Sequence, residues 1–171
     1  MTATPTIHRE RQVEFSIATA QGNFPARFSK AGLAQLFFPH RGGVAADHDP
    51  NHSEFYRWFL QTERAVRQVL AGKKIEQLPP LDLSSGTAFQ QRVWKALLEI
   101  GLGHTRTYSE IAYDLGQPGA ARAVGAACGA NPIPLLIPCH RVLAAGGKLG
   151  GFSGGLDWKR KLLAAERTEL F

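Results

Sequence analysis

The sequence predicts an α/β protein of the α+β type, in which a small N-terminal domain precedes a mainly helical one. Apolar and polar residues alternate between residues 11 and 38, as they do in half-buried strands. A proline- and serine-rich stretch (LPPLDLSSG) follows later and has the composition of a linker. Beyond it, apolar side chains recur at helical spacing. We therefore expect domains over residues 1–80 and 87–171, joined by a linker over 81–86.

The N-terminal part is predicted to contain a hairpin, a third strand and one helix. Residues 13–17 alternate between apolar and polar, and Gly22-Asn23 offers a hairpin turn before the next apolar run. Residues 33–38 form another short apolar run, and residues 39–51 read as a loop. Apolar residues then recur at helical spacing from residue 55, which predicts a helix of about 18 residues that ends near Gly72.

Two helices of the C-terminal part carry the same start signal. Thr87 is followed three residues later by Gln90, and Thr107 by Glu110. In such a capping box each side chain satisfies a backbone N–H that the helix leaves unpaired. The second of these helices is broken by a Gly-Gln-Pro-Gly stretch at residues 116–119.

A further helix is predicted immediately after that break, over residues 120–130. Two short helices joined by a tight turn form a helix-turn-helix pattern. The second helix consists almost wholly of small residues, and Arg122 is its only long side chain. Small side chains let a helix approach another surface closely. The same pattern is also expected of tight packing between helices, with Arg122 in solvent, so the pattern alone does not establish DNA binding.

The end of the chain contains a glycine-rich stretch and a last helix. Residues 146–155 lack the Gly-Lys-Ser/Thr ending of a phosphate-binding loop, and no strand–GxGxxG–helix unit surrounds them. We interpret them as a loop that lies close to a ligand pocket. Asp157 is predicted to cap a helix over residues 158–167.

Cys139 is the strongest candidate for a reactive residue. Pro138 precedes it, and His140 and Arg141 follow it. The thiolate is the reactive form of cysteine, and a neighbouring imidazole or positive charge lowers the pKa of the thiol. The apolar residues 135–137 predict a buried strand or extended segment that ends at this cysteine. A buried, inert cysteine is the alternative, but these flanking residues favour a nucleophile.

Composition limits the class of protein. The chain has 171 residues, of which 44% are hydrophobic and 20% charged, as in globular proteins. It lacks an apolar run long enough for a membrane span, and its first residues show no basic stretch followed by an apolar one, so we expect no secretory leader. Two cysteines cannot form a disulfide framework, so we expect a cytoplasmic protein without membrane contact. A net charge of +6 permits a polyanionic partner.

Metal ligands are poorly placed in the sequence. The histidines of the N-terminal half are scattered without paired ligand spacing, and no cysteine lies near them. We therefore expect neither a metal site nor a cofactor. The histidines in question are His8, His40, His48 and His52.

Four short motifs together resemble the O6-alkylguanine-DNA alkyltransferases, the methylated-DNA–protein-cysteine methyltransferases. They are RAVG at 122–125, NPIP at 131–134, PCHRV at 138–142 and SGG at 153–155, with Glu166 downstream. The resemblance is dense from about residue 87 to residue 166. It implies a ribonuclease-H-like N-terminal domain, where residues 1–80 match only in size and coarse pattern. The N-terminal cysteines that hold zinc in some members are absent from this chain.

The resemblance implies that the protein extracts a damaged nucleotide from double-stranded DNA. Flipping a base out of the stack costs a few kcal/mol, and less for a poorly paired base. In this family the helix-turn-helix enters the minor groove. Arg122 matches the residue that fills the vacated place in the base stack, and Tyr108 matches the one that displaces the phosphate. Ser109 and Gln117 fall among the DNA-binding positions.

The resemblance also assigns the chemistry to specific residues. Cys139 attacks the alkyl carbon, while Glu166, His140 and a water molecule form a relay to the thiol. Asn131 is the hinge between the helix-turn-helix and the active-site loop. The positions that match the guanine and alkyl pocket are Pro134, Val142 through its carbonyl, Phe152 and Ser153 through its N–H. Some members carry tyrosine at the position of Phe152.

The sequence thus predicts a single-turnover DNA-repair methyltransferase that acts on O6-alkylguanine, with O4-methylthymine as a second expected substrate. We expect a monomer in solution, and the sequence leaves cooperative assembly on DNA open. Two other hypotheses remain. One is a helix-turn-helix protein that senses lesions without repairing them, against which Cys139 argues. The other is a cysteine hydrolase that uses Cys139 and His140, although adjacent side chains seldom point toward each other.

Overall fold

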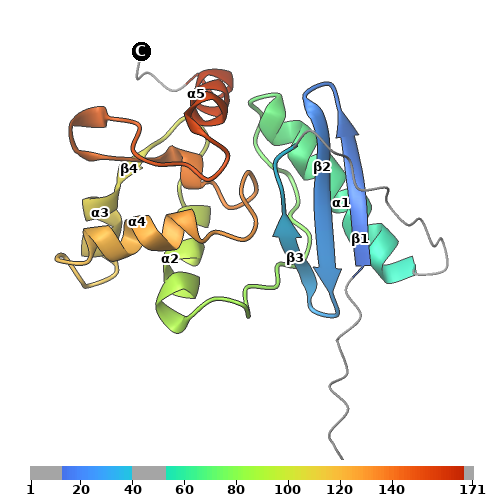
Figure 1. Cartoon of the computed structure of the whole chain (residues 1–171), viewed down its shortest axis with the longest axis horizontal. Coiled ribbons are helices and arrows are strands. Elements are labelled where there is room, and N and C mark those ends of the chain that lie inside the picture. Colours follow the sequence, from blue (N-terminus) through green and yellow to red (C-terminus); the bar gives the residue numbers. More distant parts are fainter. Residues whose placement is uncertain (1–12, 40–52, 168–171) are drawn as a thin grey trace, which may run out of the picture.

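The computed structural model describes residues 13–39 and 53–167 (Figure 1). Over these residues it is a mixed α/β fold with five α-helices, a three-stranded antiparallel sheet and a separate parallel pair of two-residue strands. The sheet and the helix over Ser53–Leu70 lie on one side of the molecule, and the helices that follow in the chain lie on the other. The elements are β1 (Val13–Thr19), β2 (Gly22–Ser29), β3 (Gly32–Leu36), α1 (Ser53–Leu70), α2 (Ala88–Leu98), β4 (Arg106–Thr107), α3 (Tyr108–Asp114), α4 (Ala121–Gly129), β5 (Val142–Leu143) and α5 (Leu156–Ala165).

The predicted hairpin is confirmed, but its turn lies earlier in the chain than the sequence suggested. Gly22 pairs with Thr19, so residues 20 and 21 form the turn and Gly22 opens β2. Gly22 has a φ of 118°, and a Cβ atom there would lie 2.7 Å from Pro39. The glycine that predicted a turn is therefore required by strand geometry and by the close approach of a neighbouring segment.

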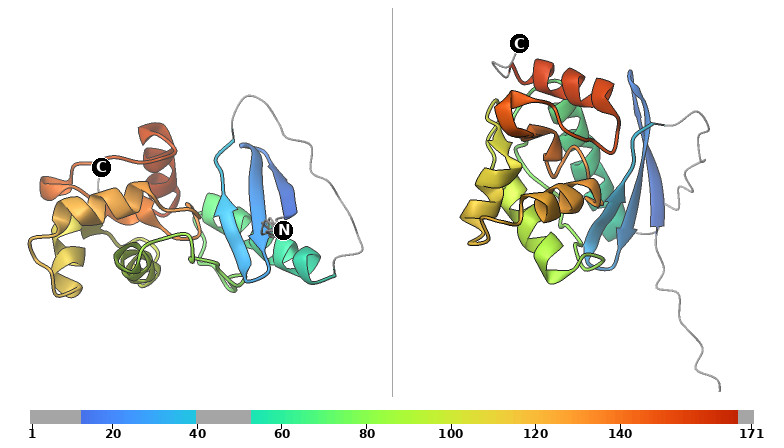
Figure 2. Two further views of the ribbon diagram at one scale, coloured as in Figure 1. Left: turned by 60° about the horizontal axis from the view of Figure 1, so that its bottom comes forward. Right: turned by 60° about the vertical axis from the view of Figure 1, so that its left-hand side comes forward.

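Helix α1 packs against β1 and β3, as Figure 2 shows from two further directions. Phe15 of β1 stacks on Phe59 of α1 with 4.9 Å between ring centroids. The hydrophobic core continues from this layer into the C-terminal helices. The backbone N–H of Leu36 donates to the carbonyl of Pro132 at 2.9 Å, which joins β3 to the segment before Cys139. The domain boundary at residues 81–86 stays a prediction.

The starts of α2 and α3 are as predicted. The hydroxyl oxygen of Thr87 accepts from the N–H of Gln90, and that of Thr107 accepts from the N–H of Glu110. Both reciprocal bonds of the capping boxes are also present. Helix α4 packs on α2 and α3, and its mostly small side chains permit this close packing.

The segment before Cys139 is a buried turn and not the predicted strand. Leu135 and Ile137 are both buried, but Leu135 has a left-handed φ of 74°. The N–H of Ile137 donates back to the carbonyl of Ile133 at 3.0 Å. Apolar composition therefore predicted the burial correctly and the extended conformation wrongly. The side chain of Asn131 supplies the hydrogen bonds that a strand partner would provide, as described below.

The last helix also starts differently from the prediction. Helix α5 begins at Leu156, and its N-cap is Gly155, which has a φ of 88° and makes no side-chain capping bond. Asp157 lies inside the first turn and pairs with Arg160 at 3.1 Å. No helix in the described part of the chain is long and apolar enough to cross a membrane.

Candidate active site

A cavity of about 630 Å³ opens between α3, α4 and the glycine-rich loop before α5. Half-buried Tyr108 and exposed Arg122 contribute to its walls, and so does the buried Cys139. The cavity therefore joins the helices with the predicted DNA-binding residues to the predicted nucleophile. The predicted site residues that line it are Tyr108, Ser109, Arg122, Cys139, Phe152 and Ser153.

Cys139 begins a short 3₁₀ turn, Cys139–Arg141, which leads into β5. Its Sγ accepts a hydrogen bond from Nδ2 of Asn131 at 3.2 Å. The same Nδ2 donates to the carbonyl of Ile137 at 2.9 Å, and Oδ1 of Asn131 accepts from the N–H of Ile133 at 3.0 Å. Asn131 thus holds both ends of the turn and the sulfur with one amide group. A donor directed at sulfur favours its ionised form.

His140, Glu166 and Arg141 form a buried network next to Cys139. Nε2 of His140 lies 2.8 Å from Oε1 of Glu166. Nε of Arg141 donates to Oε2 of the same carboxylate at 2.9 Å, and Nη2 donates to Oε1 at 2.8 Å. Nη1 of Arg141 donates to the carbonyl of Ile100 at 2.5 Å. This fork-to-fork geometry fixes the carboxylate, and the carboxylate then fixes the imidazole.

The pKa shifts of this network define its charge state. Burial raises the pKa of Glu166, but the hydrogen bonds from His140 and Arg141 outweigh that effect and bring the pKa to about 2. Burial lowers the pKa of His140, although Glu166 opposes this change. At neutral pH the carboxylate is ionised and the imidazole is uncharged. Nδ1 of His140 is buried without a hydrogen-bond partner among the described residues, so this nitrogen can accept a proton.

The thiol of Cys139 differs from the sequence-based expectation. Burial raises its pKa, while the Asn131 hydrogen bond and the charge of Lys159 lower it only in part. His140 is uncharged, and the guanidinium of Arg141 is bound to Glu166. The expectation that His140 and Arg141 depress this pKa is therefore wrong for the structure described. Neighbours in sequence proved less important than a lysine twenty residues away in the chain.

Lys159 is the functional candidate that sequence reasoning missed. Its side chain is fully buried, and Nζ donates to the carbonyls of Val142 at 2.6 Å, Gly151 at 3.2 Å and Leu149. One ammonium group therefore joins β5 to the glycine-rich loop. Burial lowers the pKa of Lys159, whereas the thiols of Cys139 and Cys128 raise it. The helical periodicity of α5 could have indicated that Lys159 is buried, because it places Lys159 three residues before the core residue Leu162 on the same face of the helix.

Other predicted site residues lie around the cavity and not in its lining. Gln117 is exposed in the turn between α3 and α4. Pro134 and Asn131 line an adjacent cavity, to which Ser153 also contributes. Val142 is fully buried, and its carbonyl accepts from Lys159 but keeps a second lone pair. The roles assigned to these residues stay predictions.

No group of three or more potential metal ligands occurs among the described residues. Of the N-terminal histidines considered in the sequence, His8, His40, His48 and His52 all lie outside the described residues. The predicted absence of a cofactor is untested.

The fold and site define a protein with a buried, hydrogen-bonded thiol at the base of a cavity beside a close-packed helix pair. The family model for the DNA-binding domain of 6-O-methylguanine DNA methyltransferases matches residues 88–168. A methylated-DNA–protein-cysteine methyltransferase from Mycolicibacterium paratuberculosis is 44% identical over 88% of this chain and 86% of its own length. The chain therefore belongs to the methylated-DNA–protein-cysteine methyltransferase family.

Two further comparisons extend this result. A relative of the same name from Mycobacterium tuberculosis is 58% identical over 98 residues, which is 57% of this chain and 59% of the relative. A crystal structure of Mycobacterium tuberculosis OGT in complex with DNA superposes with a TM-score of 0.71 and 40% identity, covering 89% of this chain and 91% of that one. The likeness in fold therefore extends into the N-terminal half.

Proposed function

We propose that this protein repairs O6-alkylguanine in double-stranded DNA by one irreversible transfer of the alkyl group to Cys139. The arrangement of Cys139 carries this proposal. Its sulfur accepts a hydrogen bond from Asn131 and lines the same cavity as Tyr108 and Arg122. Family membership and the DNA complex of the Mycobacterium tuberculosis structure support DNA as the partner.

The α3–α4 pair is the proposed helix-turn-helix, and it enters the minor groove. Ser109, Arg122 and Gln117 are exposed on or between these helices, where they can reach DNA. The exposed Ala123 and Ala126 keep the surface of α4 low enough to approach the groove floor. Arg122 then fills the space left in the stack, and Tyr108 lies at the wall of the cavity that receives the flipped base.

The transfer is an in-line displacement at the alkyl carbon. The thiolate of Cys139 forms the new S–C bond with its electron pair, and the O6–C bond breaks with its pair going to guanine. The thiol proton passes to Nδ1 of neutral His140 through solvent, and guanine takes up a proton on its ring. Glu166 holds the other ring nitrogen of His140 at 2.8 Å and stabilises the imidazolium that forms.

The pocket for the flipped guanine is proposed to lie between Phe152, Ser153, Pro134 and the backbone of Val142. Methyl transfer from O4-methylthymine fits the same site as a second reaction. We also propose the ribonuclease-H-like character of the N-terminal domain, a monomeric state in solution and a cytoplasmic location. Because the thioether of Cys139 is stable, one protein molecule reacts once.

The test is a stoichiometric transfer assay. A duplex that carries radiolabelled O6-methylguanine is incubated with a known amount of protein, and the label bound to protein is counted over time. The label should reach a plateau at one equivalent per protein, even with excess duplex. Continued turnover would contradict the single-use mechanism. Binding to the modified duplex without any transfer would favour the lesion-sensing alternative.

A further inference from the structure

The ring of Phe152 borders the cavity from a loop with little conformational restraint of its own. Gly150 and Gly155 on either side have positive φ values of 67° and 88°. Phe152 lies edge-to-face with His140 at 6.5 Å between ring centroids, and it lines the cavity together with Cys139. The position of this ring therefore sets the space in front of the sulfur. The loop needs an external contact to hold it, because glycines leave the backbone free to move.

Lys159 restrains only the backbone of this loop. Its ammonium group donates to the carbonyls of Leu149 and Gly151, before the phenylalanine. The N–H of Gly155 donates to the carbonyl of Phe152 at 3.0 Å. None of these bonds involves the aromatic ring, so another residue must determine its orientation.

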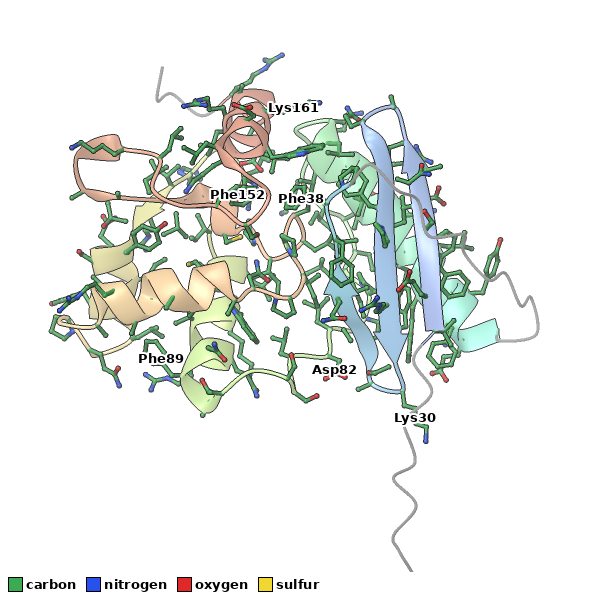
Figure 3. All side chains as sticks on the ribbon, in the orientation of Figure 1. Lys30, Phe38, Asp82, Phe89, Phe152 and Lys161 are labelled. Atoms are coloured by element: carbon green, nitrogen blue, oxygen red, sulfur yellow. The ribbon has the colours of Figure 1, made fainter. Side chains whose placement is uncertain are left out.

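Phe38, from the N-terminal half of the chain, contacts both the ring and the backbone of the loop. It follows β3, and its ring packs edge-to-face on Phe152 with 5.5 Å between centroids (Figure 3). On the backbone side, a Cβ atom at Gly154 would lie 2.5 Å from the Phe38 ring. Phe38 thus faces two positions of one short loop, and a side chain added at Gly154 would displace the Phe38 ring.

Phe38 is itself held by aromatic neighbours from two other elements. Its ring lies 5.2 Å from that of Trp158 in α5 and 6.2 Å from that of Phe24 in β2. Phe24 and Trp158 also pack edge-to-face on each other at 5.7 Å. These four rings form a continuous cluster from the buried sheet to the cavity wall, which we call the aromatic bridge: Phe24, Phe38, Phe152 and Trp158.

We propose that Phe38 is a positioning residue that determines which alkyl groups the active site accepts, by holding Phe152 against the cavity. This inference rests on the proposed function and adds a role for the N-terminal half in the transfer step. A large alkyl group such as benzyl must fit between the Phe152 ring and the sulfur of Cys139, so its transfer rate depends strongly on the position of that ring. The transfer rate of a methyl group depends on it weakly. Phe38 does not line the cavity that contains Cys139, so it acts on that cavity through Phe152.

The test compares two substrates that differ only in the alkyl group. The full chain reacts with the same duplex carrying either O6-methylguanine or O6-benzylguanine, and the ratio of the two rates is measured. Loss of folded protein or of DNA affinity lowers both rates equally and leaves the ratio unchanged. Phe38→Leu should lower the relative rate for benzyl about tenfold, the effect of removing a favourable aromatic pair. Phe38→Tyr, which keeps the ring, should restore it.

Phe59→Leu is the matched control. Phe59 is 8% exposed, as is Phe38, but it packs against Phe15 and Tyr56 away from the bridge. The Phe59→Leu variant should have the same ratio of benzyl to methyl transfer rates as the wild type. A ratio in Phe38→Leu equal to that of Phe59→Leu would reduce Phe38 to an ordinary core residue and overturn the inference. If the wild type transfers neither group, the proposed function itself fails.

A second variant perturbs the same contact from the other side. Gly154 has no left-handed φ, so Gly154→Ala introduces a methyl group against Phe38 without backbone strain. It should shift the benzyl-to-methyl ratio in the wild-type background and shift it less when combined with Phe38→Leu. Such non-additivity indicates direct coupling between the two positions. Additive effects would contradict a shared action on the Phe152 ring.

Discussion

The two cysteines of this protein share one cavity but have different surroundings. Cys139 is 4% exposed and Cys128 is 7% exposed, so burial does not distinguish them. Burial raises the pKa of both thiols, that of Cys128 to about 12, and the hydrogen bond that Asn131 donates to the sulfur of Cys139 partly offsets this effect at Cys139. Cys128 lies in the last turn of α4, a helix of small residues, and Cys139 begins a turn next to a neutral imidazole. We therefore propose that reactivity in this fold follows from hydrogen-bond partners and a proton acceptor, and not from access to the cavity.

Replacing Cys139 and replacing Cys128 should give the largest difference in alkyl transfer between any two matched variants. Cys139→Ser should abolish alkyl transfer, because a serine hydroxyl is far less ionised at neutral pH, and should leave DNA binding largely intact. Cys128→Ser is the matched variant in the same cavity and should retain transfer. The assay counts label on protein after incubation with methylated duplex. Loss of transfer in both variants would contradict the distinction between the two thiols.

Removing the charge of Glu166 should have the next largest effect. Glu166→Gln weakens the support for protonated His140, and the rate of transfer should fall on the order of a hundredfold with a shifted pH profile. The same substitution at exposed Glu99 is the control. An unchanged pH–rate profile in Glu166→Gln would contradict the proposed proton relay through Glu166 and His140.

The same carboxylate predicts an effect of pH on stability. Its folded-state pKa of about 2 lies below the ordinary 4.5, so ionisation of Glu166 stabilises the fold above pH 4.5. That contribution is lost as the pH falls toward 2. Acid unfolding of Glu166→Gln, followed by circular dichroism, should therefore depend less on pH within this window.

Replacing Arg122 distinguishes a role in extruding the base from DNA from a role in shaping the pocket around Cys139. Arg122→Ala should slow repair of duplex DNA at least about tenfold, the scale of losing one favourable stacking or phosphate contact. Reaction with free O6-benzylguanine needs no base flipping and should change little. Arg160→Ala, at an exposed arginine of α5, is the control. Equal losses on both substrates would mean that Arg122 shapes the pocket instead of extruding the base.

Replacing Lys159 tests whether its positive charge lowers the pKa of Cys139. Lys159→Met keeps the length of the side chain but removes the charge and three hydrogen bonds. The pKa of Cys139 should rise further, and a rise of one unit lowers the thiolate fraction about tenfold. Transfer rate is measured against pH on samples whose circular dichroism confirms the native fold. A profile that stays at the wild-type position would limit Lys159 to a structural role.

Phe152 should give the smallest effect. Phe152→Tyr should change the activation free energy by at most about 1 kcal/mol, the net contribution of an ordinary hydrogen bond. Phe152→Ala should be worse, because it removes the wall of the cavity next to His140. Rates with methylated duplex provide the measurement. Equal activity of the alanine variant would show that the ring does not hold the base.

Local patterns in the sequence predicted local structure well. Thr87 and Thr107 cap their helices as expected, because a capping box depends only on residues three positions apart. The family resemblance predicted Asn131 as a hinge residue, but not the hydrogen bond that its side chain donates to the sulfur of Cys139. The turn at Leu135 was not predictable from apolar composition, because burial is equally compatible with a strand. Lys159 and Phe38 were missed, because their partners are distant in the chain and only the fold brings them together.

Mapping the alkyl group on the wild-type protein tests the central claim most directly. The protein reacts to completion with duplex containing O6-methylguanine, and peptides that separate Cys128 from Cys139 are analysed by mass spectrometry. We predict one added methylene mass on the Cys139 peptide and none on the Cys128 peptide. Methyl on Cys128, or on both cysteines in comparable amounts, would contradict the claim that hydrogen-bond partners select the nucleophile.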